Sequence, residues 1–190
     1  MNLANKLTML RVVMVPLFVV FMSVGAIPLN YLWALVVFAI ASITDLLDGK
    51  IARKYDMITD FGKFLDPLAD KILVAAALVC FTQLGWTPAW VTALIIAREF
   101  AVSGVRLAAA GSDKKVVIPA NIWGKLKTAS TMVAMVTILA LRTLTDNIGV
   151  LSGLPVQLIG EILMYISAAL TLVSGATYLW DYRSYIDPTK

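Results

Sequence analysis

Six aspartates lie between positions 45 and 70 of this 190-residue chain, which is 60% hydrophobic. Four of them form two pairs at spacings of three and four residues, Asp45 with Asp48 and Asp66 with Asp70. On helices, the members of these pairs would lie about 60° and 40° apart, so each pair shares one face. Two facing helices would bring together four carboxylates, which repel one another unless a cation neutralises them. Oxygen ligands favour Mg²⁺, Mn²⁺ or Ca²⁺ over zinc, and the absence of histidine agrees. The spacing therefore predicts a divalent-cation site.

Small residues flank these acids at helical spacing. Gly49 and Ala52 each follow an aspartate by about one turn, and Gly62 precedes one by about one turn. The missing side chains would leave a groove beside the carboxylates. Arg53 lies one turn beyond Gly49, where its guanidinium suits a phosphate. A solvated loop between helices would explain the charges but not the small residues, so the pattern favours a phosphate-bearing ligand along the helix.

Together these residues form the pattern Asp-x2-Asp-Gly-x2-Ala-Arg-x8-Gly-x3-Asp-x3-Asp, and the chain matches all eight fixed positions. The pattern resembles the signature of the CDP-alcohol phosphatidyltransferases. Eight fixed residues at fixed spacing make this a far more specific signal than a lone glycine motif.

The remainder of the chain is apolar in long runs. A mean hydropathy of +0.85 with only 15% charged residues indicates an all-α polytopic membrane protein. No linker or repeat interrupts it, so we expect a single domain over residues 1–190. The basic segment 1–11 suits a short interfacial helix. It also resembles the start of a signal peptide, but cleavage would leave an odd number of spans. Six transmembrane helices are expected at about 12–28, 31–53, 61–84, 88–110, 125–141 and 156–179.

The basic residues give this topology an orientation. Of 16 lysines and arginines, only Arg142 falls on the side opposite the termini, and Arg98 falls within a span. The positive-inside rule then places both termini and the acidic site in the cytoplasm. The net charge of +4 is attributed to contact with the lipid surface and does not call for a nucleic acid.

Charged residues also occur inside the fourth expected span. Glu99, Ser103 and Arg106 share one face, whereas Arg98 points 80° to 100° away by the same geometry. Two interpretations remain open for them: interhelical salt bridges, or arginines that hold a second anionic substrate. Lys125 and Lys127, at the start of the fifth span, return to the side of the acids.

The resemblance extends over nearly the whole chain. Segments 5–11, 59–71, 97–106 and 124–128 are similar to a bacterial branch of the family. This implies a six-helix membrane fold, usually a homodimer, in the bacterial cytoplasmic (inner) membrane. It also implies CDP-diacylglycerol as donor, sn-glycerol 3-phosphate as acceptor and CMP as leaving group.

The resemblance assigns roles to individual residues. Two Mg²⁺ or Mn²⁺ ions would be bound by Asp45, Asp48, Asp66 and Asp70, and Asp70 would be the catalytic base. The donor would contact Asn5, Thr8, Asp48, Gly49, Ala52, Arg53 and Gly62. The acceptor phosphate would contact Arg98, Arg106, Lys125 and Lys127.

Other functions remain conceivable at this point. The same donor could transfer to inositol phosphate, serine or a second phosphatidyl lipid, because the eight-residue pattern concerns the donor. A divalent-cation transporter also carries intramembrane acids. Its carboxylates would line a path at mid-membrane, whereas these lie at helix ends beside Arg53, which would repel a cation.

Overall fold

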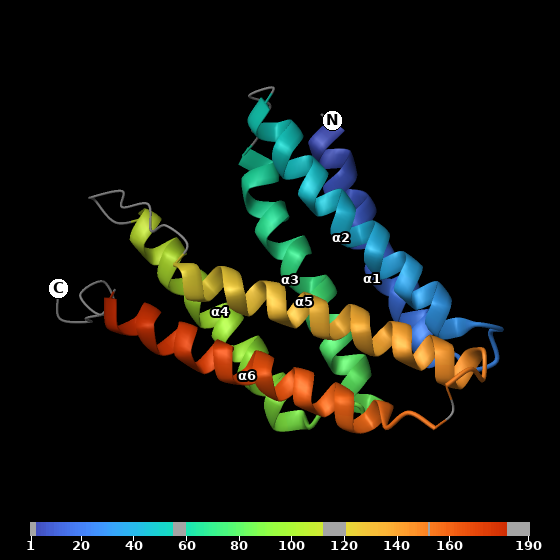
Figure 1. Cartoon of the computed structure of the whole chain (residues 1–190). Coiled ribbons are helices and arrows are strands. Elements are labelled where there is room, and N and C mark those ends of the chain that lie inside the picture. The colour runs from blue at the N-terminus through green and yellow to red at the C-terminus, as the bar shows by residue number, and fades with distance from the viewer. Residues whose placement is uncertain (1–2, 55–59, 112–120, 152, 182–190) are drawn as a thin grey trace. The chain divides into compact units, whose positions relative to one another are not determined.

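The computed structural model describes residues 3–54, 60–111, 121–151 and 153–181, with the side chains of 7–44, 69, 71–106, 121–151 and 153–181. Six α-helices and one short π-helix, and no β-strand, occur within these ranges (Figure 1). Their bounds are α1 Leu3–Ser23, α2 Asn30–Lys54, α3 Asp60–Gln83, α4 Ala89–Gly111, α5 Ile122–Arg142, η1 Thr143–Asn147 and α6 Val156–Asp181. The all-helical class expected from the sequence is thus observed.

The helices are distributed over two compact units. The first unit comprises Met1–Gly85 and Met135–Val156, and the second comprises Trp86–Ala134 and Gln157–Lys190. The first therefore holds α1, α2, α3 and η1, and the second holds α4 and α6. Helix α5 begins in the second unit and ends in the first.

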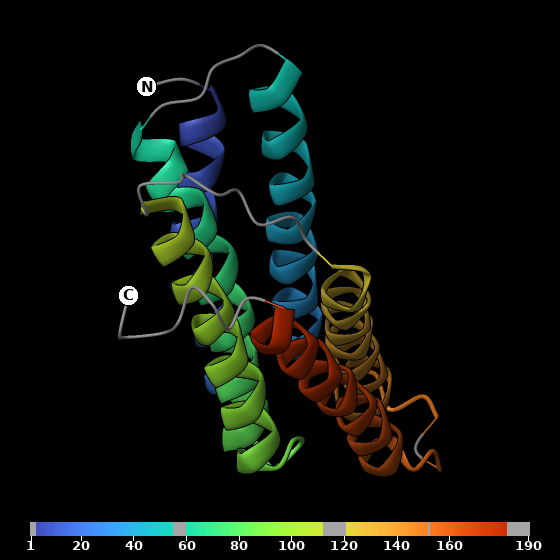
Figure 2. The same cartoon turned by 90° about the vertical axis from the view of Figure 1, so that its left-hand side faces the viewer.

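In the first unit, α1 packs against both α2 and α3 (Figures 1 and 2). Phe18 of α1 and Phe38 of α2 are fully buried, with ring centroids 5.8 Å apart. Aromatic pairs at this separation contribute beyond the apolar area that they bury. This contact fixes the register of the two helices, which matters for the residues nearer to their polar ends.

A polar clasp joins η1 to the start of α2. The Asn147 side chain accepts a hydrogen bond from the Tyr31 backbone N–H at 3.0 Å and donates one to Asn30 Oδ1 at 3.0 Å. Asn30 in turn donates to the Phe21 carbonyl at 3.2 Å. Because the first N–H groups of a helix lack intrahelical partners, Asn147 satisfies one that would otherwise stay unpaired.

The structure corrects one expectation about the N-terminus. We expected a separate interfacial helix over 1–11, but α1 is one continuous helix, Leu3–Ser23. Thr8 and Arg11 are buried, at 0% and 1% exposed, while the apolar Met9 and Val13 are exposed. No helix-breaking residue separates the basic start from the apolar run, so the helix continues. Its polar face packs inward instead of lying at a surface.

Helix α6, like α1, has buried polar residues and exposed apolar residues. Its buried face carries polar groups, Ser167, Thr171, Ser174 and Tyr178. Its exposed positions are occupied mainly by large apolar residues: Leu158, Ile162, Ile166, Leu172, Val173, Leu179 and Trp180. A water-soluble helix would show the opposite arrangement, so α6 has the character of a helix surrounded by lipid.

Two stretches are long and apolar enough to cross a membrane, Ile122–Asn147 and Val156–Asp181. Three shorter apolar stretches lie at Leu7–Ser23, Asn30–Thr44 and Lys71–Gln83. Among the described residues, these findings fit a membrane protein. The expectation of six spans, with both termini in the cytoplasm, stays a prediction.

Candidate functional site

The acid-bearing segments lie on two regular helices of the first unit. Helix α2 continues to Lys54, as the sequence predicts, and α3 begins at Asp60. The backbone is therefore helical at all four aspartates. Their side chains, with those of Asn5, Gly49, Ala52, Arg53 and Gly62, lie outside the described residues. The metal site and most of the donor site stay predictions.

Helical register shows which faces those positions continue. Ala34, Phe38 and Ala41 of α2 are fully buried and form one stripe. Four and seven residues beyond position 41, the same stripe reaches Asp45 and Asp48.

Helix α3 shows the same relation in the opposite direction. Leu73, Ala77 and Phe81 are buried on one face, and counting back three and seven residues from position 73 gives Asp70 and Asp66. Both helices pack on α1. The acids thus occupy register positions that continue the packed faces of α2 and α3.

Helix α1 contributes a buried cation near these positions. Arg11 is the bulkiest of the described side chains that are almost completely buried. From the Phe18–Phe38 contact, seven residues along α1 lead to Arg11 and seven along the antiparallel α2 lead to Asp45, a rise of about 10 Å in each case. Arg11 is thus at the level of the first aspartate. Thr8, one turn beyond, is the single predicted donor residue whose side chain the structure describes, and it is fully buried.

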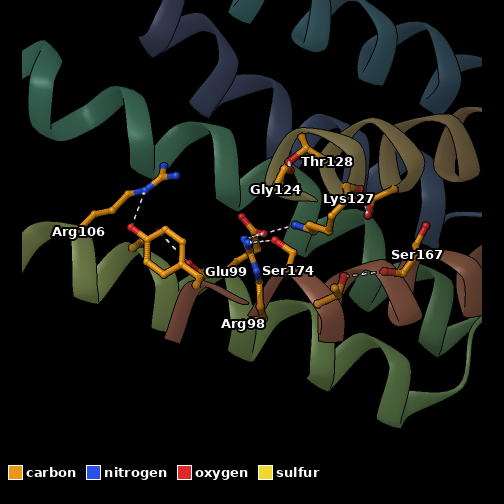
Figure 3. A network of polar contacts seen from close by, with 12 residues as sticks. Arg98, Glu99, Arg106, Gly124, Lys127, Thr128, Ser167 and Ser174 are labelled. Atoms are coloured by element: carbon orange, nitrogen blue, oxygen red, sulfur yellow. Dashed lines mark hydrogen bonds and ion pairs between the residues drawn. The ribbon is translucent and has the colours of Figure 1, made fainter. Parts of the chain in front are cut away.

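A second polar cluster occupies the interior of the second unit (Figure 3). The carboxylate of Glu99 on α4 forms ion pairs with Arg98, at 3.2 Å, and with Lys127 of α5. Arg98 also donates a hydrogen bond from Nη2 to the hydroxyl of Ser174 on α6. The Lys127 side chain is only 3% exposed and that of Arg98 13%. Burial on this scale strengthens charge interactions relative to those at an aqueous surface.

Arg106, also on α4, contacts the face of α6 that carries Ser174. Its Nε donates to the Tyr178 hydroxyl at 3.1 Å, and its guanidinium carbon lies 5.5 Å from the centroid of that ring. Although Arg98 and Arg106 point about 80° apart on α4, both reach α6, because Ser174 and Tyr178 are one helical turn apart. Helix α4 thus has the interhelical salt bridge of the first interpretation, between Glu99 and Lys127, and both arginines contact α6. That the arginines hold a second anionic substrate stays a prediction.

The two lysines expected in this site, Lys125 and Lys127, occupy different environments. Lys127 is buried in the cluster, whereas Lys125 is exposed. Residues two apart on a helix lie about 160° apart, so both could not face the same cluster. The structure thus brings together Arg98, Arg106 and Lys127 around α4 and α6 and leaves Lys125 outside.

Sequence reasoning treated α6 as a plain span and missed Ser174 and Tyr178. A signal was present, since Ser167, Thr171, Ser174 and Tyr178 recur at spacings of four, three and four in an apolar helix. That is the repeat of one helix face. The hydroxyl of Ser167 contacts that of Ser130 on α5 at 3.4 Å, so this polar stripe faces other helices of the unit.

Comparisons with known proteins now bear on this arrangement. The family model described as CDP-alcohol phosphatidyltransferase matches residues 1–173. The chain belongs to this family. The match covers the acid-bearing helices and the charged residues of the second unit, Arg98, Glu99, Arg106 and Lys127, and it ends one residue before Ser174.

Relatives match the chain over nearly its full length. A Bacillus subtilis protein named CDP-diacylglycerol--glycerol-3-phosphate 3-phosphatidyltransferase is 39% identical over 96% of this chain and 94% of its own. A Rickettsia bellii protein with the same name is 38% identical over 97% of each. A Mycobacterium tuberculosis protein named probable phosphatidylglycerophosphate synthase is 42% identical over 94% of this chain and 80% of its own.

Proposed function

We propose that this CDP-alcohol phosphatidyltransferase transfers the phosphatidyl group of CDP-diacylglycerol to sn-glycerol 3-phosphate, which gives phosphatidylglycerol phosphate and CMP. The near full-length similarity to relatives named for this reaction supports the choice of substrates. The observation that carries it in the structure is the set of cations on one face of α6, with Arg98 and Lys127 largely buried and Arg106 bonded to Tyr178, since a transferase with an anionic acceptor needs cations for that acceptor.

The cluster suits an anion. Among the described residues, Arg98, Lys127 and Arg106 supply three cationic charges and Glu99 one negative charge, a balance that favours a phosphate monoester. The Nε of Arg98 is buried and donates no hydrogen bond to any described residue. A buried donor of this kind is costly unless an acceptor reaches it. A phosphate oxygen would supply that acceptor.

The donor set on α2 and α3 fits divalent metal ions. Asp45, Asp48, Asp66 and Asp70 continue the packed faces of the two helices, where uncompensated carboxylates would be strongly unfavourable. All four offer oxygen ligands, which Mg²⁺ and Mn²⁺ prefer. Two such ions, when bound, would neutralise charge on the donor pyrophosphate and on the departing CMP oxygen.

The transfer itself is a direct displacement. Asp70 takes the proton from the 1-hydroxyl of sn-glycerol 3-phosphate as that oxygen attacks the phosphorus that bears diacylglycerol. The bond from this phosphorus to the CMP oxygen breaks, and CMP leaves with the bonding electrons. No histidine is present in the chain to act as base.

The donor is positioned by residues of α1, α2 and α3. Gly49 and Ala52 let the cytidine and ribose approach the backbone of α2, and Gly62 leaves the corresponding space on α3. Arg53 binds the nucleotide phosphates through charge-assisted hydrogen bonds. Asn5 and Thr8 complete the pocket from α1.

We further propose a homodimer of six-span subunits in the bacterial cytoplasmic (inner) membrane, with both termini and the site on the cytoplasmic side. The basic residues gathered on that side support the orientation, which gives access to water-soluble glycerol 3-phosphate.

A CMP-release assay tests the reaction. Purified protein is supplied with CDP-diacylglycerol, Mg²⁺ or Mn²⁺, and one acceptor at a time: glycerol 3-phosphate, inositol phosphate, serine or phosphatidylglycerol. We expect labelled lipid only with glycerol 3-phosphate and no CMP after chelation of the metal. Asp70→Asn should lower kcat by about 10²-fold or more, the loss typical for a general base.

Asp146→Asn is the matched control, since Asp146 lies on η1 in an exposed ion pair with Arg142 and should leave kcat unchanged. CMP release with another acceptor alone would replace the acceptor while keeping the family chemistry. Absence of CMP with every acceptor and both metals, from folded protein, would contradict the enzyme itself.

A further inference from the structure

Three residues on one face of α6 contact the two arginines of α4. Ser174, Gly175 and Tyr178 lie within about one helical turn of each other. Ser174 and Tyr178 are both 2% exposed, although α6 otherwise shows apolar side chains at its exposed positions. Two buried hydroxyl groups on such a helix need partners, and the guanidinium groups of α4 are those partners (Figure 3).

The Arg98 side chain is held at two points along its length. At its end, Nη2 donates to the Ser174 hydroxyl while Nη1 pairs with Glu99. Along its stem, Cγ passes close to Gly175, where an added Cβ would come within 3.3 Å of it. A side chain at position 175 would therefore displace the arginine, and the glycine allows the close approach.

Among the described residues, Tyr178 orients the Arg106 side chain. Tyr178 offers its hydroxyl to Nε and its ring face to the guanidinium carbon, 5.5 Å from the ring centroid. The bond to Nε engages one edge of the guanidinium, and no bond from the two terminal nitrogens to another described residue is observed. Those nitrogens form the planar fork that matches a phosphate.

We propose that Ser174, Gly175 and Tyr178 of α6 are positioning residues that hold Arg98 and Arg106 in the geometry required to bind the phosphate of the acceptor. The inference rests on the proposed function in its choice of acceptor, and it adds to that function a helix to which sequence reasoning gave no role. Long cationic side chains lose rotamer freedom when they bind a ligand, so arginines ordered in advance bind phosphate more tightly.

The test uses three variants, each with a matched control. Tyr178→Phe removes one hydroxyl and keeps the ring, with Tyr165→Phe on an exposed part of α6 as control. Gly175→Ala adds one methyl group against Arg98, with Gly104→Ala as control, since nothing lies within 4 Å of a Cβ there. Ser174→Ala removes the acceptor of Arg98, and Ser174→Thr should restore it.

Each protein is assayed for KM of both substrates, kcat, and the inhibition constant of inorganic phosphate against glycerol 3-phosphate. Tyr178→Phe and Ser174→Ala should each raise KM for glycerol 3-phosphate at least about tenfold, the lower end of what is expected for one hydrogen bond to a charged group. The phosphate inhibition constant should rise by the same factor, while KM for CDP-diacylglycerol stays constant. The controls and Ser174→Thr should behave as wild type.

A purely structural role would lower thermal stability or raise both KM values together, and either result without a selective change for phosphate would overturn the proposal. A binding measurement separates this inference from the proposed function. Binding of inorganic phosphate is measured by the increase in thermal stability that it causes. If wild-type protein makes no CMP with glycerol 3-phosphate but phosphate stabilises it more than it stabilises the variants, the function fails and the positioning role stands. If phosphate stabilises all of them equally, the positioning role fails.

Discussion

At the scale of single residues, Glu99 is a carboxylate enclosed by cations. It contacts Arg98 and Lys127, and its own side chain is 22% exposed. Breaking such a pair costs more than the pair contributes, because it leaves buried charges without compensation. Glu99 therefore stabilises the two cations by compensating their charge.

We predict that Glu99→Gln lowers the free energy of unfolding by about 2 kcal/mol, below the range for fully buried pairs because Glu99 is partly exposed. Thermal unfolding in detergent would measure it. Asp146→Asn provides the comparison, since the Arg142–Asp146 pair is on the surface and should be worth at most about 1 kcal/mol. Equal losses from both substitutions would show that the carboxylate of Glu99 does not stabilise the cluster.

At the scale of elements, the sequence predicted helices well where a long apolar run defined them. It extended α2 beyond Thr44 through the acids, because an apolar run so short could not end there and still cross a bilayer. It failed for the first eleven residues, where burial of Arg11 by neighbouring helices decides the outcome. Burial of Arg11 depends on packing between helices that are distant in sequence, so the local sequence pattern does not predict it.

The candidate site was predictable to a similar extent. The resemblance grouped Arg98, Arg106, Lys125 and Lys127 as cations for the acceptor phosphate. It did not separate the two lysines, of which Lys127 is buried and Lys125 exposed, because charge alone does not say which lysine faces inward. The partner helix was missed, since serine and tyrosine in an apolar span are usually packing residues. Family membership, by contrast, followed from eight residues of one motif and is confirmed.

The Asn147 clasp is another element-scale feature that the sequence did not reveal. We predict that Asn147→Ala lowers the free energy of unfolding by about 1–3 kcal/mol, because the Tyr31 N–H loses its acceptor and Asn30 loses its donor. Chemical or thermal unfolding would measure the loss. Gln157→Ala, at an exposed position of α6, should change stability by no more than about 0.5 kcal/mol. If the two variants were equally stable, the clasp would be irrelevant to the fold.

At the scale of the whole molecule, many described surface positions are apolar, and several buried positions are polar. Large apolar side chains are exposed on α1, α2, α5 and α6, among them Val13, Ile43, Val133 and Leu172. Water does not tolerate continuous apolar surface of this extent. The CDP-alcohol phosphatidyltransferase family and this surface together indicate a membrane protein.

Orientation in that membrane yields a direct prediction. On a Cys80→Ala background, which removes the single native thiol, Asp146→Cys should react with a membrane-impermeant maleimide added to intact cells. Lys125→Cys should react only after the cells are opened. Both positions have exposed side chains, so accessibility depends on sidedness alone. Labelling of both in intact cells, or of Lys125→Cys alone, would contradict the proposed topology.

The enclosure of the Glu99 cluster has a consequence for ionic strength. Mobile ions screen charges at an aqueous surface over about 10 Å at moderate salt, but they screen buried pairs much less. Lys127 and Arg98 are held with their counter-charge inside the second unit, out of reach of most dissolved ions. The ion pairs of Lys127 and Arg98 with Glu99 should therefore depend little on the salt concentration of the surrounding solution.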